Sequence, residues 1–330
     1  MIKDYPLISV VIPVKNEAAL LSRCLESLMK LDYPKEGLEI IIADGLSTDN
    51  TKDVASSFGV KVVANDRQIV VSGRNRGFEV ARGDIIAFTD ADCIFDARWL
   101  RNSIKYFTDD DLVGGVGGVT LAPQDSSSFE KAVDFLFHLA EIFQTTAHRR
   151  HSNSAKEVND IPGCNSLYRK SVLSKVMPVD ENLLTAEDVW MNLCIKNYGY
   201  KFILAPDVIL WHYRRSSPKR FLRQIYRFAI GRMQVGRRAP KLFNIFHILA
   251  ALSLPVLLVA GIFFYFSAAL SLFLKIILAF FIVVLFLSWV KTKSPLVALN
   301  LPLVVVIFIF AWSIGFLKEL FFPLKEAKCK

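Results

Sequence analysis

The sequence predicts an α/β domain with a mostly parallel sheet and flanking helices, followed by C-terminal transmembrane helices. Two observations support this prediction. Up to about residue 243, short apolar runs alternate with stretches of helical periodicity, and beyond it long apolar runs dominate. Strict alternation of strands and helices is typical of βαβ units. We therefore expect a first domain at residues 1–218, a basic amphipathic interfacial segment at 219–243 and a membrane domain at 244–330.

The elements of the first domain are expected to alternate along the chain. Apolar runs bounded by turn residues predict strands, and apolar residues at helical spacing predict helices. We expect strands at residues 7–13, 38–44, 60–63 and 85–88, and helices at 18–31, 48–58 and 74–81. Such an order favours right-handed crossovers and a mostly parallel sheet, and sheets of this type bind ligands at the carboxyl ends of their strands.

Carboxylates collect at three of these strand ends. The strand at residues 85–88 is followed by Asp90 and Asp92, which can point to the same side where the strand opens into a loop. Two converging carboxylates suit one hard divalent cation, which in turn binds phosphates. On its own, a D-x-D pair is more often a pair of solvated loop acids. Residues 13–17 and 44–49, which end two earlier strands, supply the further acids that favour a shared site.

Composition narrows the class of protein. With 53% hydrophobic and 22% charged residues, the 330 residues suffice for one large soluble domain and a membrane part. The five cysteines are scattered and form no C-x-x-C pair, which argues for a reducing compartment and against a zinc site or a disulfide framework. The formal charge of +9 predicts that the protein binds a membrane surface and anionic ligands. We do not expect it to bind nucleic acid.

Three apolar segments, each near the ~20 residues that a helix needs to cross a bilayer, follow at residues 248–266, 270–290 and 296–317. A buried hairpin of a soluble protein is the alternative, which three successive runs disfavour. Positive residues collect on the cytoplasmic side. The flanking clusters, and with them the first domain, are therefore expected there; they are Arg237, Arg238, Lys241, Lys291 and Lys293. Three crossings would leave the tail lysines on the far side, against this rule; they are Lys325, Lys328 and Lys330.

The strand-end motifs follow one another in a recognisable order. They are Val-Ile-Pro-Val-Lys-Asn-Glu at 11–17, Ala-Asp-Gly-Leu-Ser-Thr-Asp at 43–49, Gly-Arg-Asn-Arg-Gly at 73–77, Ala-Arg-Gly-Asp at 81–84 and Thr-Asp-Ala-Asp at 89–92. With these motifs, the chain resembles glycosyltransferase family 2 over about residues 7–235. The resemblance implies a GT-A fold, which is Rossmann-like, a nucleotide-diphospho-sugar donor, a divalent cation and inversion at the anomeric carbon.

The same resemblance implies residues for the donor's nucleoside. Pro13 and Glu17 would line its pocket, and Asp44 would meet the base. From the residues alone, the loop after Asp44 combines a turn glycine with Ser, Thr and Asp residues that cap the next helix, so a purely structural connection is the alternative. Leu46 stands where a small residue is usual in the family, which concerns the local shape of the loop.

Other residues would hold the metal and the diphosphate. By resemblance, Asp90 would approach the ribose and the metal, with Asp92 as the more direct ligand of Mn²⁺ or Mg²⁺. Arg74 and Arg76, at the start of a helix, could reach a diphosphate through charge-assisted bonds, although arginines on a helix face are usually solvated. His212 follows an apolar run and is more often a structural residue. Because a histidine near this point approaches the metal in some relatives, His212 is a weaker candidate ligand.

A second group of motifs follows downstream. Pro-Gly-Cys-Asn-Ser at 162–166 resembles the family segment that closes over donor and acceptor, which places Gly163 and Asn165 on the acceptor and sugar side. Glu187 and Asp188 match the family's E-D pair, in which the aspartate is the catalytic base. An inverting displacement needs such a base for the acceptor hydroxyl. The alternative is a capping box with Thr185 as N-cap, and a capping loop is also a rigid mount for a carboxylate.

A basic amphipathic helix is expected just before the membrane segments. Arg220, Arg223 and Arg227 fall on one face and large apolar residues on the other, which is typical of a helix at an anionic membrane interface. An ordinary surface helix is the alternative, and residues 129–143 could form a second interface helix or core. Gln224 and Arg227 also resemble the family's Q-x-x-R-W signature for the nucleotide sugar, with Phe228 in place of tryptophan.

Together these features predict a multi-pass cell-membrane protein with its catalytic domain in the cytoplasm. The expected activity is inverting hexosyl transfer from a UDP- or GDP-sugar to a lipid-linked acceptor, a polyprenyl-linked saccharide or a glycolipid. Two alternatives are a polyprenyl-phosphate glycosyl synthase, of the dolichyl-phosphate mannose or glucose type, and a processive polysaccharide synthase. Synthases of the first type often lack the Q-x-x-R signature, and three spans are few for an enzyme of the second type. A nucleotidyltransferase usually has a Gly-rich loop after its first strand, which residues 14–17 lack. A membrane-anchored scaffold is the non-enzyme alternative, against which the complete set of acids argues.

Overall fold

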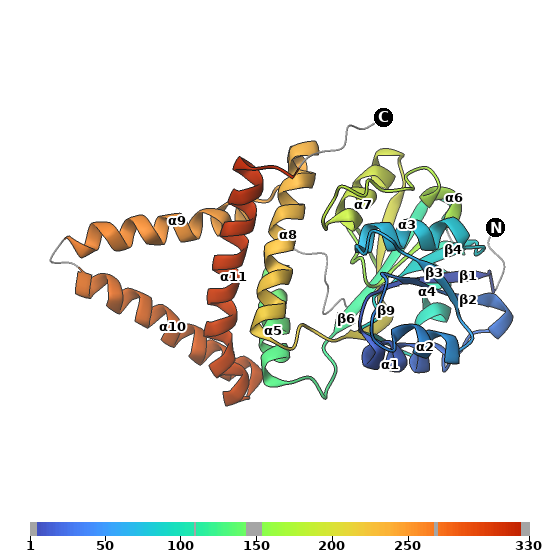
Figure 1. Ribbon diagram of the computed structural model, residues 1–330, viewed down its shortest axis with the longest axis horizontal. Coiled ribbons are helices and arrows are strands. Elements are labelled where there is room, and N and C mark those ends of the chain that lie inside the picture. Colours follow the sequence, from blue (N-terminus) through green and yellow to red (C-terminus); the bar gives the residue numbers. More distant parts are fainter. Residues whose placement is uncertain (1–4, 109, 143–153, 267–269, 325–330) are drawn as a thin grey trace. The chain divides into compact units, whose positions relative to one another are not determined.

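The computed structural model describes residues 5–108, 110–142, 154–266 and 270–324. The chain divides into two compact units, each described here by itself. The first comprises Met1–Pro123 and Ala147–His212, and the second comprises Gln124–Thr146 and Tyr213–Lys330. Figure 1 shows the course of the chain through both.

The described part of the first unit is built on one nine-stranded sheet. Its order is β3-β2-β1-β4-β8-β6-β9-β5, and β7 pairs with β9. The strands are β1 (Ile8–Val14), β2 (Leu38–Asp44), β3 (Lys61–Ala64), β4 (Ile85–Phe88), β5 (Cys93–Phe95), β6 (Val113–Leu121), β7 (Lys156–Val158), β8 (Ser166–Arg169) and β9 (Lys201–His212). Strands β3, β2, β1 and β4 are parallel, as the sequence predicts.

The other half of the sheet is mixed. Strand β8 is antiparallel to both β4 and β6, and β5 and β7 are antiparallel to β9, while β6 and β9 are parallel. The parallel part is therefore smaller than the sequence predicts. The antiparallel β8 lies directly beside β4, and so it brings the loop that precedes it to the strand end that carries Asp90.

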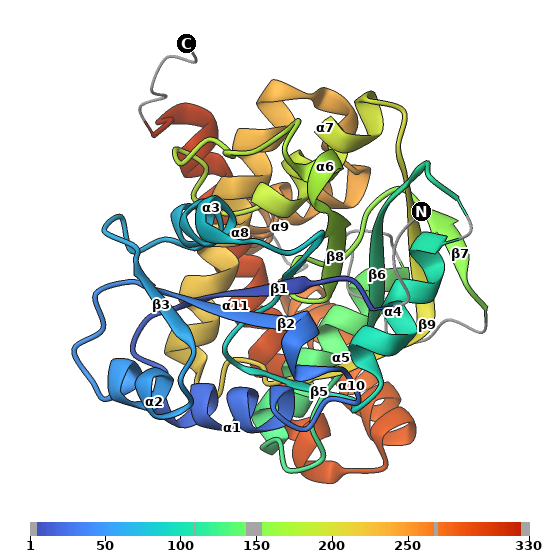
Figure 2. The same cartoon turned by 90° about the vertical axis from the view of Figure 1, so that its right-hand side faces the viewer.

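Helices cover both faces of this sheet. They are α1 (Ala18–Leu28), α2 (Thr51–Ser57), α3 (Val70–Val80), α4 (Trp99–Thr108), α6 (Lys170–Leu173) and α7 (Glu187–Asn197), with a short 3-10 turn at Lys35–Gly37. Figures 1 and 2 show α1 and α2 on one face and α3, α6 and α7 on the other. Alternate residues of a buried strand face the two layers, which is why the sequence of β1 is almost continuously apolar.

The core reflects this alternation. Val10 and Ile12 of β1 are fully buried in one cluster with Leu25 of α1 and Trp99 of α4. Val11 points to the other face, where α3 approaches so closely that a Cβ on Gly77 would lie 2.2 Å from Val11 Cγ1. The last glycine of the Gly-Arg-Asn-Arg-Gly motif is thus required for packing.

The second unit is helical. It contains α5 (Ser128–Ile142), α8 (Pro218–Arg238), a 3-10 turn at Pro240–Leu242, α9 (Ile245–Tyr265), α10 (Leu270–Thr292) and α11 (Pro295–Phe321). Helices α9, α10 and α11 are long and apolar enough to cross a membrane, close to the predicted segments. Helix α8 is basic and amphipathic as predicted, but most of its apolar residues, among them Phe221 and Ile225, are buried in a cluster with α5 and α11, while Leu222 is exposed. The apolar face expected at a membrane interface is therefore mostly covered by protein.

Replacing Gly77 by alanine should destabilise the first unit by about 1–3 kcal/mol, because the new Cβ overpacks α3 against Val11. This cost exceeds the gain in helix propensity of about 1 kcal/mol. The midpoint of thermal unfolding of the purified full chain measures the change. Arg76→Ala, on the exposed side of the same helix, is the control and should change stability by less than about 0.5 kcal/mol. Equal midpoints for the two variants would contradict this close packing.

Candidate functional site

Three loops meet at the carboxyl edge of the parallel strands. Val14, the last residue of β1, is paired with Asp44, the last residue of β2. The two following loops are joined, because the Asn16 N–H donates to Ser47 Oγ (2.9 Å) and the Thr48 N–H donates to Asn16 Oδ1 (2.8 Å). Left-handed backbone at Asn16 (φ 54°), Leu46 (φ 56°) and Gln68 (φ 58°) shapes the loops after three neighbouring strands.

The residues predicted for the nucleoside lie at this edge. The Asp44 carboxylate is buried, accepts the Ser47 N–H (N···Oδ2 3.1 Å) and lies 3.5 Å from Lys52 Nζ. Pro13 and Glu17 are partly exposed, and the Glu17 N–H donates to Thr51 Oγ1 (3.1 Å). The structure brings these residues together, and their contact with a nucleoside stays a prediction.

The predicted metal ligands form a compact cluster. One ligand atom from each of Asp90, Asp92 and His212 lies within 4.8 Å of the other two. His212 is opposite Cys93 in the pairing of β5 with β9, and its Nε2 is 2.9 Å from Asp92 Oδ1. Burial lowers the pKa of His212, but the Asp92 carboxylate and Cys164 together outweigh burial and raise that pKa to about 10. Two carboxylates and an imidazole fit a divalent cation such as Mn²⁺ or Mg²⁺.

An overlapping set of softer ligand atoms shares His212. It consists of His212 with the thiols of Cys93 and Cys164, and all three residues are buried. The sequence shows no pattern that predicts this set. Burial raises the pKa of the Cys93 thiol well above its usual value, with Cys164 and Asp92 adding to the effect. Because hard cations such as Mg²⁺ and Mn²⁺ prefer oxygen ligands to sulfur, the carboxylate set is the better candidate for such a cation.

Arg74 connects the predicted metal ligands to the E-D pair. Its guanidinium is buried, with Nη1 2.8 Å from Glu187 Oε1 and Nη2 3.6 Å from Asp90 Oδ1. Nη2 also donates to the Gly163 carbonyl (2.9 Å), and the guanidinium carbon lies 5.4 Å from the centre of the Phe88 ring. The sequence predicts that Arg74 binds a diphosphate. In the structure its guanidinium is engaged by two carboxylates and a carbonyl.

The E-D pair begins α7. The N-cap residue of this helix is Ala186 and not Thr185, and Ala186 is in a left-handed conformation (φ 63°) that is strained for alanine. Asp188 is half-buried, and its Oδ2 accepts the Gly163 N–H (3.1 Å). Glu187 is buried, and burial raises its pKa to about 7 although Arg74 opposes the effect.

The two residues predicted for the acceptor side differ in their surroundings. Gly163 contacts Asp188 through its N–H and Arg74 through its carbonyl, and a Cβ there would lie 2.6 Å from Asp188 Oδ2. Asn165 is fully buried, accepts the Trp99 indole N–H (2.8 Å) and donates to two backbone carbonyls. The side-chain amide of Asn165 is thus held by the core of the first unit, and its predicted place on the acceptor side stays a prediction.

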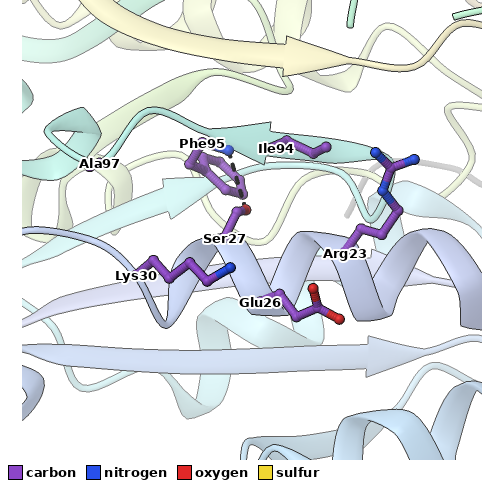
Figure 3. A pocket seen from close by; sticks show the side chains of 7 residues that line it. All are labelled: Arg23, Glu26, Ser27, Lys30, Ile94, Phe95 and Ala97. Carbon is purple, nitrogen blue, oxygen red and sulfur yellow. Dashed lines mark hydrogen bonds between the residues drawn. The ribbon is translucent and has the colours of Figure 1, made fainter. Parts of the chain in front are cut away.

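Gln224 and Arg227 lie on α8 in the second unit, and both are partly exposed. Their predicted contact with the nucleotide sugar stays a prediction. A surface pocket of about 400 Å³ lies between α1 and β5 and contains none of the predicted site residues. Figure 3 shows its mixed charged lining and the bond from the Phe95 N–H to Ser27 Oγ. We assign this pocket no role.

Comparison with known proteins identifies the family. The model of the family described as glycosyl transferase family 2 matches residues 9–177. The chain belongs to this family. The glycosyltransferase AglE of Haloferax volcanii is 29% identical over 71% of this chain and 76% of its own length. A dolichyl N-acetyl-alpha-D-glucosaminyl phosphate 3-beta-D-2,3-diacetamido-2,3-dideoxy-beta-D-glucuronosyltransferase of Methanococcus voltae is 27% identical over 95% of this chain and 97% of its own length.

A solved structure confirms the fold of this glycosyltransferase. The mannosyltransferase PcManGT of Pyrobaculum calidifontis, in complex with GDP-Man and Mn²⁺, aligns with a TM-score of 0.64 over 92% of this chain and 87% of that chain. At 21% sequence identity, this likeness shows the fold alone. The predicted GT-A fold, the family and the enzyme class are thus confirmed.

Removing the Arg74 guanidinium should cost about 3–5 kcal/mol of stability, because Glu187 and Asp90 would lose their buried positive partner. Thermal unfolding of Arg74→Ala measures the loss. The control is Arg67→Ala, because the Arg67 side chain is exposed and its ion pair with Glu181 is worth at most about 1 kcal/mol.

Charge removal on both sides of the pair provides a second test. Arg74→Met combined with Glu187→Gln should recover part of the stability lost in Arg74→Ala, since fewer buried charges remain without a partner. If Arg74→Ala unfolds at the same temperature as Arg67→Ala, Arg74 does not hold the site together.

Proposed function

We propose that this protein is an inverting glycosyltransferase that transfers a hexose from a nucleotide-diphospho-sugar to a lipid-linked saccharide or glycolipid. One observation supports this proposal above the others. A single buried guanidinium joins Asp90 of the candidate metal cluster to the E-D pair. The groups required on the donor side and on the acceptor side of the transferred sugar therefore belong to one network.

The donor side consists of the parallel strand ends. Asp90, Asp92 and His212 would hold a divalent cation, Mn²⁺ or Mg²⁺, which neutralises charge on the donor's diphosphate. Pro13, Glu17 and Asp44 lie along the same edge and would contact the nucleoside of a UDP- or GDP-sugar. The PcManGT structure contains GDP-Man and Mn²⁺, which is consistent with this class of donor and cation.

Asp188 is the proposed catalytic base. An acceptor hydroxyl gives its proton to this carboxylate while its oxygen attacks the anomeric carbon from the face opposite the diphosphate. The new glycosidic bond forms as the bond from the anomeric carbon to the phosphate oxygen breaks, and the diphosphate leaves with the electron pair. The Gly163 N–H fixes Asp188 Oδ2, and Arg74 holds the neighbouring Glu187 so that Asp188 keeps its orientation.

Two observations favour a lipid-linked acceptor. Three helices of the second unit are apolar enough to enter a bilayer, so the enzyme would meet acceptors at a membrane surface. The relative from Methanococcus voltae, which matches nearly the whole chain, is named for transfer to a sugar carried on dolichyl phosphate. The basic residues that flank the apolar helices favour the cytoplasmic face for the proposed reaction, because positive residues collect on that side of a membrane.

Asp188→Asn should lower the rate of sugar transfer by about 10²–10⁴-fold while donor binding persists, because the amide keeps the shape but cannot take the proton. Release of nucleotide and formation of glycolipid are measured with detergent-solubilised full chain, a panel of nucleotide sugars and polyprenyl-linked acceptors. Asp53→Asn, an exposed acid on α2, is the control. If the Asp188→Asn enzyme stayed active, Asp188 would not be the catalytic base. Transfer to bare polyprenyl phosphate, with none to any lipid-linked sugar, would refute the acceptor class.

Asp92→Ala should weaken the binding of Mn²⁺ in the presence of nucleoside diphosphate by at least about tenfold. Calorimetry and the electron paramagnetic resonance signal of free Mn²⁺ measure this change without turnover. His212→Ala tests the third ligand, and the exposed Asp66→Ala is the control. Unchanged Mn²⁺ affinity in Asp92→Ala would exclude the proposed cluster as the cation site.

A further inference from the structure

Helices α8 and α11 of the second unit lie side by side (Figure 1). Their carboxyl ends are bonded to each other, because Arg237 Nη2 of α8 donates to the carbonyls of Glu319 (2.5 Å) and Leu320 (2.7 Å) in α11. Further along, Gly315 of α11 packs so closely that a Cβ there would lie 2.5 Å from the Tyr226 carbonyl of α8. At the other end of α11, Asn300 Nδ2 donates to Ser128 Oγ of α5 (3.3 Å).

Helix α8 is too basic to lie within hydrocarbon. It carries seven positive side chains and no acid; they are Lys219, Arg220, Arg223, Arg227, Arg232, Arg237 and Arg238. Each would cost about 2.5–3.5 kcal/mol at the centre of a membrane-spanning helix. Because α8 must remain at or outside the membrane surface, the helix that is packed and bonded along it must also remain there.

Chain connectivity leads to the same result. Arg237 precedes the start of α9 at Ile245 by a few residues, so it marks the side from which α9 enters the bilayer. If α9 and α10 both cross, the chain returns to that side before α11 begins at Pro295. The carboxyl end of α11 is bonded to Arg237, again on that side. Both ends of α11 therefore lie on one side of the membrane.

The burial of the three apolar helices separates them in the same way. In the most apolar 18-residue stretch of each, 44% of α11 is buried by protein, compared with 6% of α9 and none of α10. A helix with apolar side chains exposed all around is a lipid-facing span. With 21 and 23 residues, α9 and α10 are about 32 and 34 Å long, enough for a hydrocarbon core of about 30 Å. Figure 1 shows that α9 and α10 converge at the end that lies away from α11. Near that end, the ring of Phe264 in α9 stacks on the ring of Phe273 in α10.

We propose that α9 and α10 form a hairpin that crosses the bilayer, and that α11 lies along the bilayer surface on the side of α8. One face of α11 packs against α8 and α5, and the other rests on lipid. This outer face is apolar and exposed along the whole helix, as at Leu299, Leu303, Phe310 and Ile314. The partner of this surface is the lipid boundary between headgroups and acyl chains.

Two crossings also remove a conflict in the charge distribution. With two crossings, the basic residues before α9, those between α10 and α11, and the lysines that follow α11 in the sequence would all be on one side. Three crossings would separate the tail lysines from the rest. The sequence rule that positive residues stay on one side and the packing of α11 thus agree, although the two observations are independent.

Single-cysteine labelling of the full chain in sealed membrane vesicles tests the proposal. The background variant is Cys194→Ser with Cys329→Ser, since the other three cysteines are buried. Three reporters are compared. Native Cys329, which follows α11 in the sequence, is kept in the Cys194→Ser variant. Phe266→Cys at the far end of α9 and Lys219→Cys on α8 are each introduced into the background variant. A membrane-impermeant maleimide should label Cys329 and Lys219→Cys from the same side and Phe266→Cys only from the opposite side, or after permeabilisation. The background variant gives the residual labelling.

Labelling of Cys329 together with Phe266→Cys, and apart from Lys219→Cys, would overturn the proposal. Labelling of all three from one side would show that the hairpin does not cross either, and would overturn it as well. If Cys329 does not react even in detergent, protease digestion of a C-terminal epitope tag in the same vesicles is the measurement that decides. The tag should be digested from the side on which Lys219→Cys reacts.

Discussion

The buried charge of Arg74 is the constraint on which the candidate site depends. A guanidinium inside a protein needs partners, and here they come from three separate segments: Asp90 after β4, Gly163 before β8 and Glu187 at the start of α7. None of these segments is adjacent to another in sequence. The arginine therefore converts three loop ends into one rigid assembly, and the Asp188 carboxylate takes its position from that assembly through Gly163.

Much of the first unit could be predicted from the sequence. Continuous apolar runs, turn residues and helical periodicity are local signals. The parallel strands β1 to β4 and the acids at their ends can therefore be predicted from the sequence. The antiparallel position of β8 between β4 and β6 is a long-range pairing that no local pattern encodes. The same limit applies to the surroundings of Asn165, because a short motif does not reveal that Trp99 and two backbone carbonyls will form hydrogen bonds with its side-chain amide.

Hydropathy has a similar limit in the second unit. It measures the composition of a segment, and by that measure α9, α10 and α11 are alike. Only packing distinguishes them, because much of one helix is covered by protein and the others are nearly bare. The basic residues of α8 are visible in the sequence, but their relevance to α11 arises from contacts such as that of Arg237 with the carbonyls of Glu319 and Leu320.

The left-handed residues at the strand ends have a consequence for the proposed donor binding. Asn16, Leu46 and Gln68 each hold their loop in a conformation that few residues adopt, and hydrogen bonds between the loops of Asn16 and Leu46 keep the two together. Such loops have little conformational entropy left to lose when a ligand arrives. The cost of ordering these loops is met during folding, so a nucleotide that bound at this edge, as proposed, would meet a preorganised surface whose ordering does not oppose its affinity.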